Sequence, residues 1–386
     1  MLDQSELLTS AEELGALLTQ RGDEIEQARR LPADIAGMMG QAGFYRMGAP
    51  AEVGGLETPP MISSQVFETL AQHDASAAWV AFIGTTSYTN LAALPASVGR
   101  RVLEDPATLI TGVFAPTGTA QKTSDGYRVS GRWQWGSGSQ NAAWIMGGVM
   151  LQQDGEPILD RHGRPKSTMV MMAHEDIEFL DTWHVSGLCG SGSLDYQVQD
   201  LLVPEHHVVG LKSDDRVQPT TLFRFPAFTF LALGIAAVCL GIARASITEL
   251  VSLAQTKRRV GARNTIAEQQ VAQMTLAQAE ADLRSARLFY YQAIEEAWRE
   301  ATADGNVSLA SRRDLRLATN NAVSKSVAVV EAMYNLGGGS AVYRSSRLQR
   351  HFRDINVAKS HIMVSGQVLE ITGALYFGLE PNVSRL

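Results

Sequence analysis

The spacing of hydrophobic positions changes twice along the chain, near residues 107 and 215. Up to residue 107, hydrophobic side chains recur every three or four positions, as in "AEELGALLTQRGDEIEQARR" (11–30), and this spacing predicts amphipathic helices. From 108 to 215 the hydrophobic runs are short and are separated by Gly, Asp and Pro, as around "GYRVSGRWQW" (126–135), which is typical of β-strands. After residue 215, long helical segments return.

This order of elements predicts an α+β fold in three parts. We expect an N-terminal helical domain at 1–107, a central antiparallel β-barrel or sandwich at 108–215, and a C-terminal four-helix bundle at 216–386. The bundle is indicated by "EQQVAQMTLAQAEADLRSARLFYYQAIEEAW" (268–298), a long Ala-rich segment. Such a helix buries a face only against similar partners.

One segment has the composition of a membrane span. The stretch "FPAFTFLALGIAAVCLGIA" (225–243) carries no charge and is at the lower length limit for crossing a bilayer. It stands alone and runs on into "RASITELVSLAQTKRR", so we expect the buried central helix of the bundle. The acidic, polar N-terminus lacks the basic region and apolar core of a signal peptide. These features predict a cytoplasmic protein that does not bind membranes.

Composition and motifs exclude several classes of function. A net charge of −7 without any dense run of Lys and Arg argues against nucleic-acid binding. Cys189 and Cys239 belong to no CxxC pair or His/Cys cluster, so we expect free thiols and no metal site. No GxGxxG opens a βαβ unit, and the nearest stretch, "GLCGSGSLDY" (187–196), lies among strands. Any chemistry with NADH would therefore need a nicotinamide site on another protein.

The stretch "SGRWQWGSGSQNAAW" (130–144) is unusual in composition. It holds three of the six tryptophans of the chain, three glycines and three serines, and no acidic residue. An ordinary β-hairpin and a site for a flat aromatic ligand both agree with this composition. The residues alone leave the two interpretations open.

Three segments in order along the chain resemble the acyl-CoA dehydrogenase fold. They are "LPADIAGMMGQAGFYRMGAPAEVGG" (31–55), "DTWHVSGLCGSGSLDYQVQDLLVPEHHVV" (181–209) and "GGGSAVYRSSRLQRHFRDINVAKSH" (337–361). The resemblance implies a flavin between the β-domain and the C-terminal helices, and a homotetramer. The dehydrogenases carry a catalytic glutamate about nine residues after the arginine of the "RD" pair. Counted from Arg353, that position is Ile362, and His361 stands beside it.

Three stretches, "GYRVSGRWQWGSGSQNAAW" (126–144), "FRFPAFTFLALGIAAVCLGIARAS" (223–246) and "RDINVAKSH" (353–361), are together more similar to the two-component flavin-dependent monooxygenases. This group includes oxygenases of phenols, dibenzothiophene and indoles. This resemblance implies an oxygenase component that uses FADH2 or FMNH2 and O2, through a flavin C4a-hydroperoxide, to oxygenate an aromatic or heteroaromatic molecule. A separate NAD(P)H:flavin reductase would supply the reduced flavin. The alternatives are an acyl-CoA dehydrogenase-like enzyme with Glu370 as a displaced base, and a member of the fold without flavin.

The same resemblance assigns roles to residues of this chain. Trp135 would pack against the isoalloxazine ring, Ser137 would bond near flavin N5, and His361 would be an acid or base toward substrate. The remaining cofactor-binding candidates are Ser139, Gly190, Ser191, Ser193, Arg263 and Arg353, and the substrate-binding candidates are Ser87, Tyr88, Phe225 and Phe228. For each of them a structural role is also open: a turn, a solvated charge or core packing.

Overall fold

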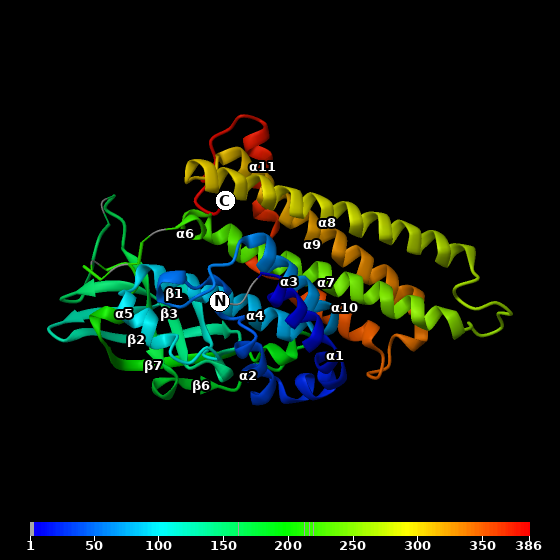
Figure 1. Cartoon of the computed structure of the whole chain (residues 1–386), viewed down its shortest axis with the longest axis horizontal. Helices are drawn as coiled ribbons and strands as arrows, with labels where there is room; N and C mark the ends of the chain where they lie inside the picture. The colour runs from blue at the N-terminus through cyan, green and yellow to red at the C-terminus, as the bar shows by residue number, and fades with distance from the viewer. Residues whose placement is uncertain (1–3, 161, 212, 216, 219) are drawn as a thin grey trace.

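The computed structural model of the chain describes residues 4–160, 162–211, 213–215, 217–218 and 220–386. Its N-terminal part is helical (Figure 1) and consists of α1 (Gln4–Ala28), α2 (Ala33–Gln41), α3 (Pro60–His73), α4 (Ala75–Tyr88) and α5 (Ala96–Val102). α3 begins with a proline in its first turn, where a missing N–H costs nothing. α4 is capped by Asp74, whose side chain accepts a hydrogen bond from Ala77 N at 2.9 Å.

A single sheet follows, with strands in the order β4-β3-β1-β2-β7-β6 and with β5 paired to β3. The strands are β1 (Ile110–Thr123), β2 (Gly126–Gly136), β3 (Trp144–Gln153), β4 (Glu156–Pro157), β5 (Ser167–Ala173), β6 (Glu178–Leu180) and β7 (Leu194–Val203). β1 and β2 form a hairpin, and β7 pairs antiparallel with β2.

The expectation of a wholly antiparallel sheet is wrong at one pair, because β1 and β3 run parallel. β2 ends beside the N-terminal end of β1. The chain then crosses over this N-terminal end before β3 begins opposite Ile110, the first residue of β1. β3 must therefore run in the same direction as β1. Alternating hydrophobic positions predict strands but do not determine which strands pair, so the sequence could not reveal this crossing. We call residues 137–143 the crossing segment.

The C-terminal part is a helical bundle built around α7. Its helices are α6 (Thr221–Arg224), α7 (Ala227–Thr256), α8 (Gln270–Asp304), α9 (Leu309–Gly337), α10 (Arg347–Ala358) and α11 (Gly366–Tyr376). α7 packs against α9 and α10 of the bundle and against α3 and α4 of the N-terminal part, so one core joins the two helical regions. The α7–α8 hairpin extends far from the sheet, and its connecting loop lies at the opposite end of the molecule (Figure 1).

Helix α7 is long and apolar enough to cross a membrane by length and composition, and no other helix among the described residues passes this test. However, 94% of its most apolar window is buried inside the protein. A helix that is apolar on all sides and covered by other helices is typical of the centre of a helical core. The packing agrees with the expectation of a buried helix.

Candidate functional site at the crossing segment

The crossing segment turns Trp135 and Ser137 in opposite directions. Trp135, at the end of β2, has a φ of 65°, and Gly138 has a φ of 74°. Trp135 is the more costly case, because a bulky residue rarely adopts the left-handed region. With this backbone, the indole of Trp135 is 69% exposed, whereas Ser137 is only 7% exposed. A flat, exposed aromatic face thus lies directly beside an inward-pointing hydroxyl.

Ser137 belongs to a buried chain of hydroxyl groups. Its Oγ accepts a hydrogen bond from the indole Nε1 of Trp79 at 3.0 Å and lies 2.7 Å from Ser193 Oγ. Ser193 Oγ lies 2.7 Å from Ser191 Oγ in turn. Gly138 N donates to Ser191 O at 2.7 Å, which fixes the crossing segment against the "GSGS" stretch. The structure therefore brings together three serines that the sequence singled out in two separate motifs.

The "GSGS" stretch is held in place by the C-terminal "RD" pair. Leu188 has a φ of 50°, and its N–H donates to the buried carboxylate of Asp354 on α10 at 2.7 Å. A Cβ on Gly187 would collide with the backbone oxygen of Arg353, so only glycine fits this position. Burial raises the pKa of Asp354 to about 7. Asp354 thus positions Ser191 and Ser193 from a helix that follows them by about 160 residues in the sequence.

His361 reaches the same site from the C-terminal side. It precedes the 3-10 turn Ile362–Val364, and its Nδ1 accepts a hydrogen bond from Met363 N at 3.2 Å. Its ring centroid lies 6.1 Å from that of Trp79. Burial, together with the positive charge of Arg316, lowers the pKa of His361 to about 4, so the imidazole is neutral near pH 7. Since Nδ1 accepts, the proton of the neutral ring is on Nε2, which is a donor.

Trp79 connects the two predicted catalytic residues, because its indole bonds Ser137 and lies against the imidazole of His361. The sequence reasoning did not assign it a role. α4 is apolar on nearly all sides, so periodicity does not mark any one residue of this helix as functional. The sequence does offer one sign of such a role. A tryptophan on an apolar helix is expected to be buried, and its N–H then requires a hydrogen-bond acceptor.

Exposed aromatic side chains and unpartnered buried hydroxyls near the crossing segment could contact a flat polar ligand. Phe114 lies on β1 and Trp135 lies near the end of the neighbouring strand β2. Phe114 is 39% exposed, so two aromatic side chains are open to solvent on neighbouring strands. Ser139 Oγ and Thr111 Oγ1 are buried and have no hydrogen-bond partner among the described residues. Buried polar atoms of this kind require a ligand or a water molecule.

Arg353 and Arg263 do not join this cluster within one chain. Arg353 donates to Glu26 Oε1 at 2.8 Å, to Gln349 Oε1 at 2.6 Å and to Ser186 O, so its guanidinium ties α10 to α1 and to the loop before β7. Its ion-pair partner is Glu26. Arg263 is exposed in the loop between α7 and α8, at the end of the molecule far from the sheet (Figure 1).

The predicted substrate-binding residues differ in what they can offer. Tyr88 is fully buried and its hydroxyl donates to Thr108 O at 2.6 Å, so this group is already used within the fold. Ser87 is also buried. Phe225 packs in the core against Trp298, with ring centroids 6.1 Å apart, while Phe228 is 42% exposed. Of the four, Phe228 presents the most surface to a ligand.

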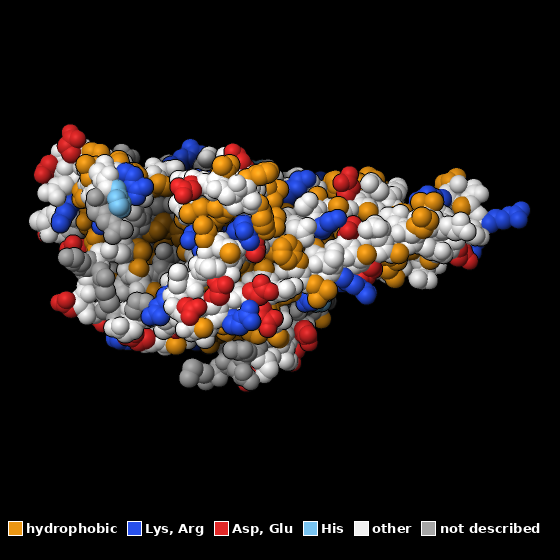
Figure 2. All heavy atoms as spheres, turned by 90° about the horizontal axis from the view of Figure 1, so that it is seen from above, with side chains coloured by type: hydrophobic (Ala, Val, Ile, Leu, Met, Phe, Trp, Pro, Cys, Tyr) orange, Lys and Arg blue, Asp and Glu red, His pale blue; other side chains and the backbone are white. Residues whose placement is uncertain are grey.

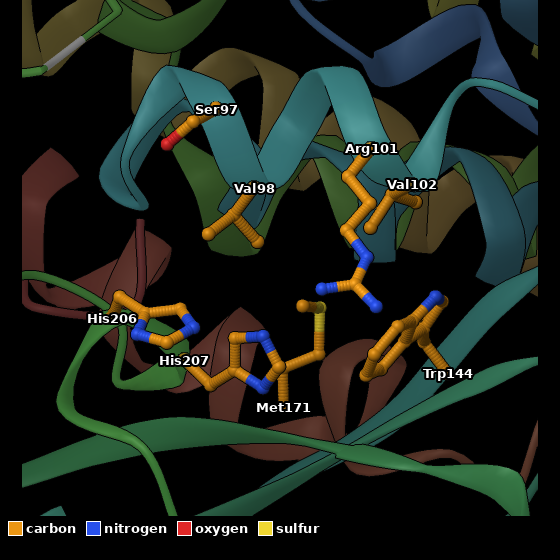
Figure 3. Close-up of a pocket in the computed structure, with 8 residues that line it drawn as sticks. All are labelled: Ser97, Val98, Arg101, Val102, Trp144, Met171, His206 and His207. Atoms are coloured by element: carbon orange, nitrogen blue, oxygen red, sulfur yellow. The ribbon is translucent and has the colours of Figure 1, made fainter.

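A cavity that opens to solvent lies elsewhere. It has a volume of about 150 Å³ and opens between α5, β3, β5 and the 3-10 turn Glu205–His207 (Figure 3). Arg101, Trp144 and His207 point toward one another across it. Burial, with the nearby charges of His206 and Arg101, lowers the pKa of His207 to about 4. None of the residues predicted from sequence to bind cofactor or substrate lines this cavity.

Comparison with known proteins assigns the fold first. The family model of the acyl-CoA dehydrogenase N-terminal domain matches residues 3–94, and that of the C-terminal domain matches residues 233–366. The crystal structure of the HsaA monooxygenase from M. tuberculosis superposes with a TM-score of 0.88 and 24% identity over 100% of both chains. The chain therefore has the acyl-CoA dehydrogenase fold.

The relatives then identify the family. Indole-3-acetate monooxygenase of Pseudomonas putida is 32% identical over 93% of this chain and 90% of its own. The structure of XiaF from Streptomyces sp. in complex with FADH2 and glycerol is 25% identical, with a TM-score of 0.87 over 98% of this chain and 97% of that one. The chain belongs to the flavin-dependent monooxygenases of the acyl-CoA dehydrogenase fold. The predicted family and fold are confirmed, and the dehydrogenase alternative is not supported.

The site agrees with this membership. The exposed faces of Trp135 and Phe114 suit a flat tricyclic ring, and the serine chain offers hydroxyl groups for its polar edge. Ile362 stands where the dehydrogenases need a base, and Glu370 lies exposed on α11 rather than in the serine cluster. The residues present therefore fit a flavin that is used without abstraction of an α-proton by a carboxylate.

Proposed function

We propose that this protein is the oxygenase component of a two-component system that oxygenates an aromatic or heteroaromatic small molecule with reduced flavin and O2. The observation that carries the proposal is the arrangement of Ser137 and His361 around Trp79, with Trp135 exposed two residues before Ser137, in a chain whose relatives are monooxygenases. The bound reduced flavin would supply the electrons that activate O2. Both FADH2 and FMNH2 agree with the residues described.

In this proposal Ser137 contacts the flavin near N5. Its Oγ accepts from Trp79 Nε1 and also bonds Ser193 Oγ, and the direction of the second bond decides what Ser137 presents to the flavin. If Ser193 donates, the Ser137 proton points outward as a donor. If Ser137 donates, one of its lone pairs is available as an acceptor. The serine chain can therefore meet either state of the flavin edge without any movement of heavy atoms.

His361 would act on the substrate as a hydrogen-bond donor through Nε2. The hydrogen bond from Met363 N to Nδ1 selects the tautomer that carries its proton on Nε2. A base at Nε2 would require the other tautomer, whose Nδ1–H would face the N–H of Met363. We therefore assign His361 a role as an orienting hydrogen-bond donor, for instance toward a hydroxyl or ring acceptor of the substrate.

We further propose a homotetramer and a separate flavin reductase as partners. Exposed hydrophobic side chains are found on the face of the molecule that carries α8 and α11 (Figure 2), and they include Leu288, Phe377 and Leu379. Surfaces of this kind commonly mark subunit contacts. Association of subunits would also give Arg263 a route to the flavin of a neighbour. Among the relatives, the name of the FADH(2)-dependent resorcinol hydroxylase, oxygenase component, of Rhizobium sp. describes such a division of labour.

The test is a reaction under 18O2 with reduced FAD or FMN supplied by a generic reductase and NADH. We expect one labelled oxygen atom in the product from an aromatic substrate such as indole-3-acetate, indole or a phenol. Release of hydrogen peroxide alone with every aromatic offered, together with reduction of tightly bound oxidised flavin by an acyl thioester, would overturn the proposal. Light scattering of the purified protein measures the oligomeric state independently.

A further inference from the structure

Arg316 is a buried cation that forms no ion pair with a side chain of the described residues. It lies on α9, is only 1% exposed, and forms one hydrogen bond, from Nη2 to Met363 O at 2.7 Å. Its Nε and Nη1 atoms have no hydrogen-bond partner in the part of the chain that the structure describes. Burial lowers the pKa of Arg316 to about 10, so the guanidinium remains charged at neutral pH. Buried charges are normally paired, because an unpaired one is strongly unfavourable.

Arg316 lines a small cavity. The cavity has a volume of about 20 Å³ and is lined by Arg316, Ser365, Gln367 and Arg385, with apolar walls from Ile362, Met363, Val368, Ile371 and Leu386. Two arginines, a hydroxyl and a side-chain amide meet there, and no Asp or Glu lines the cavity. The main-chain oxygen of Leu386, the last residue of the sequence, already accepts from Arg312 Nη2 at 2.7 Å. A volume of this size holds about one water molecule or one small ion. The cavity thus combines positive charge, hydrogen-bond donors and room for a single small group.

We propose that Arg316 forms, with Ser365 and Gln367, a binding site for one small monovalent anion, such as chloride or formate. The guanidinium supplies the charge and the two unpaired N–H donors, and Ser365 and Gln367 supply further donors. The small volume excludes larger anions. The site itself does not depend on the proposed oxygenase function.

This anion would also stabilise the turn that carries His361. Arg316 donates to Met363 O, and the N–H of the same residue donates to His361 Nδ1. Asn320, one helical turn after Arg316, donates to Ser365 O at 3.1 Å. α9 thus holds the 361–365 turn from one side while Trp79 lies against the imidazole from α4. Arg316 and Asn320 are therefore positioning residues for His361, and an anion that fixes Arg316 also fixes this turn. This consequence alone rests on the proposed function.

The direct test is a bromide soak of crystals of the full-length protein, followed by location of the anomalous signal. We expect a bromide peak in contact with Nε and Nη1 of Arg316 that is lost in Arg316→Met. The absence of a peak at this position at saturating bromide would overturn the proposal. A peak that persists in Arg316→Met would overturn it too, because it would mark an adventitious ion only.

A solution measurement covers the case in which Arg316→Met does not fold. The Tm of the wild-type protein should be about 2 °C higher in sodium chloride or formate than in sodium gluconate at equal ionic strength, for an anion at about ten times its Kd. Gluconate is too large for the cavity and controls for screening. The difference should vanish in Arg316→Met and persist in Arg299→Met, an exposed arginine of α8. Equal Tm values in all three salts for the wild type would contradict the site.

The effect on His361 is measured separately. If the proposed function holds, the fraction of consumed O2 that appears in product should be severalfold lower in gluconate than in chloride. If the protein binds the anion but gives the same product yield in chloride and in gluconate, the positioning role is refuted and the anion site still stands. Failure of the proposed function itself would be recognised by the absence of oxygenated product in every salt.

Discussion

The hydroxyl of Ser137 offers the sharpest test of the site, because two predicted effects of its removal can be measured independently. In Ser137→Ala the buried indole N–H of Trp79 loses its acceptor, while Ser193 keeps its bond to Ser191. An unsatisfied buried donor costs about 1–3 kcal/mol, so we expect the free energy of unfolding to fall by that amount. This first effect tests the geometry and requires no flavin.

The second effect concerns coupling of O2 consumption to product. Loss of one hydrogen bond to the flavin, worth about 1.4 kcal/mol, would raise the ratio of hydrogen peroxide to product about tenfold. The assay compares O2 consumption, peroxide and product for the wild type, Ser137→Ala and the control Ser191→Ala. The control shortens the serine chain at its far end and leaves the acceptor of Trp79 in place. Unchanged coupling in Ser137→Ala, or an equal loss in both variants, would refute the assignment of Ser137 to the flavin.

Three further predictions concern the elements that position the site. The pKa of His361 is lowered to about 4 from 6.5, so the unfolded chain binds more protons between these values and this contribution to stability is lost as pH falls. His361→Asn should flatten the rise of unfolding free energy between about pH 4 and 6.5 seen in urea titrations, and an unchanged slope would contradict the burial of this ring. The pH dependence that Asp354 contributes has the opposite sign. Its pKa is raised to about 7, so its ionisation is unfavourable in the folded state, and the free energy of unfolding falls as the pH rises from about 4 to 7. Asp354→Asn keeps an acceptor for Leu188 N and should remove that fall, whereas Asp354→Ala should also weaken flavin binding measured by equilibrium dialysis. Gly187→Ala should lower the melting temperature by several degrees and weaken flavin binding, because its Cβ meets the backbone of Arg353; a variant with wild-type values would show that this loop can shift freely.

Much of the fold follows from local patterns. Helical spacing before residue 107, short runs between Gly, Asp and Pro, and the uncharged 225–243 stretch each predict an element that the structure contains. The reason is that periodicity and turn residues act over a few neighbouring positions. The order of three sequence motifs likewise predicted the fold, and the resemblance of further stretches predicted the family, and the comparisons confirm both.

The site depends on contacts that no local pattern contains. The parallel pairing of β1 with β3 requires the chain to cross the N-terminal end of β1. This crossing places Ser137 against Trp79 and the "GSGS" stretch. The roles assigned to Trp135, Ser137 and His361 remain predictions, but the contacts of Ser137 and His361 with Trp79 are a structural observation.

The sequence by itself determined which residues form helices and strands and which motifs mark the family, because these depend on neighbours along the chain. Only the tertiary structure decided that Arg353 pairs with Glu26 and that Trp79 joins Ser137 to His361. It also decided that Arg316 is buried with Nε and Nη1 unpartnered among the described residues. Each of these facts concerns residues far apart in sequence. The environment of such a group, and therefore its charge and hydrogen bonding, exists only once the elements have packed.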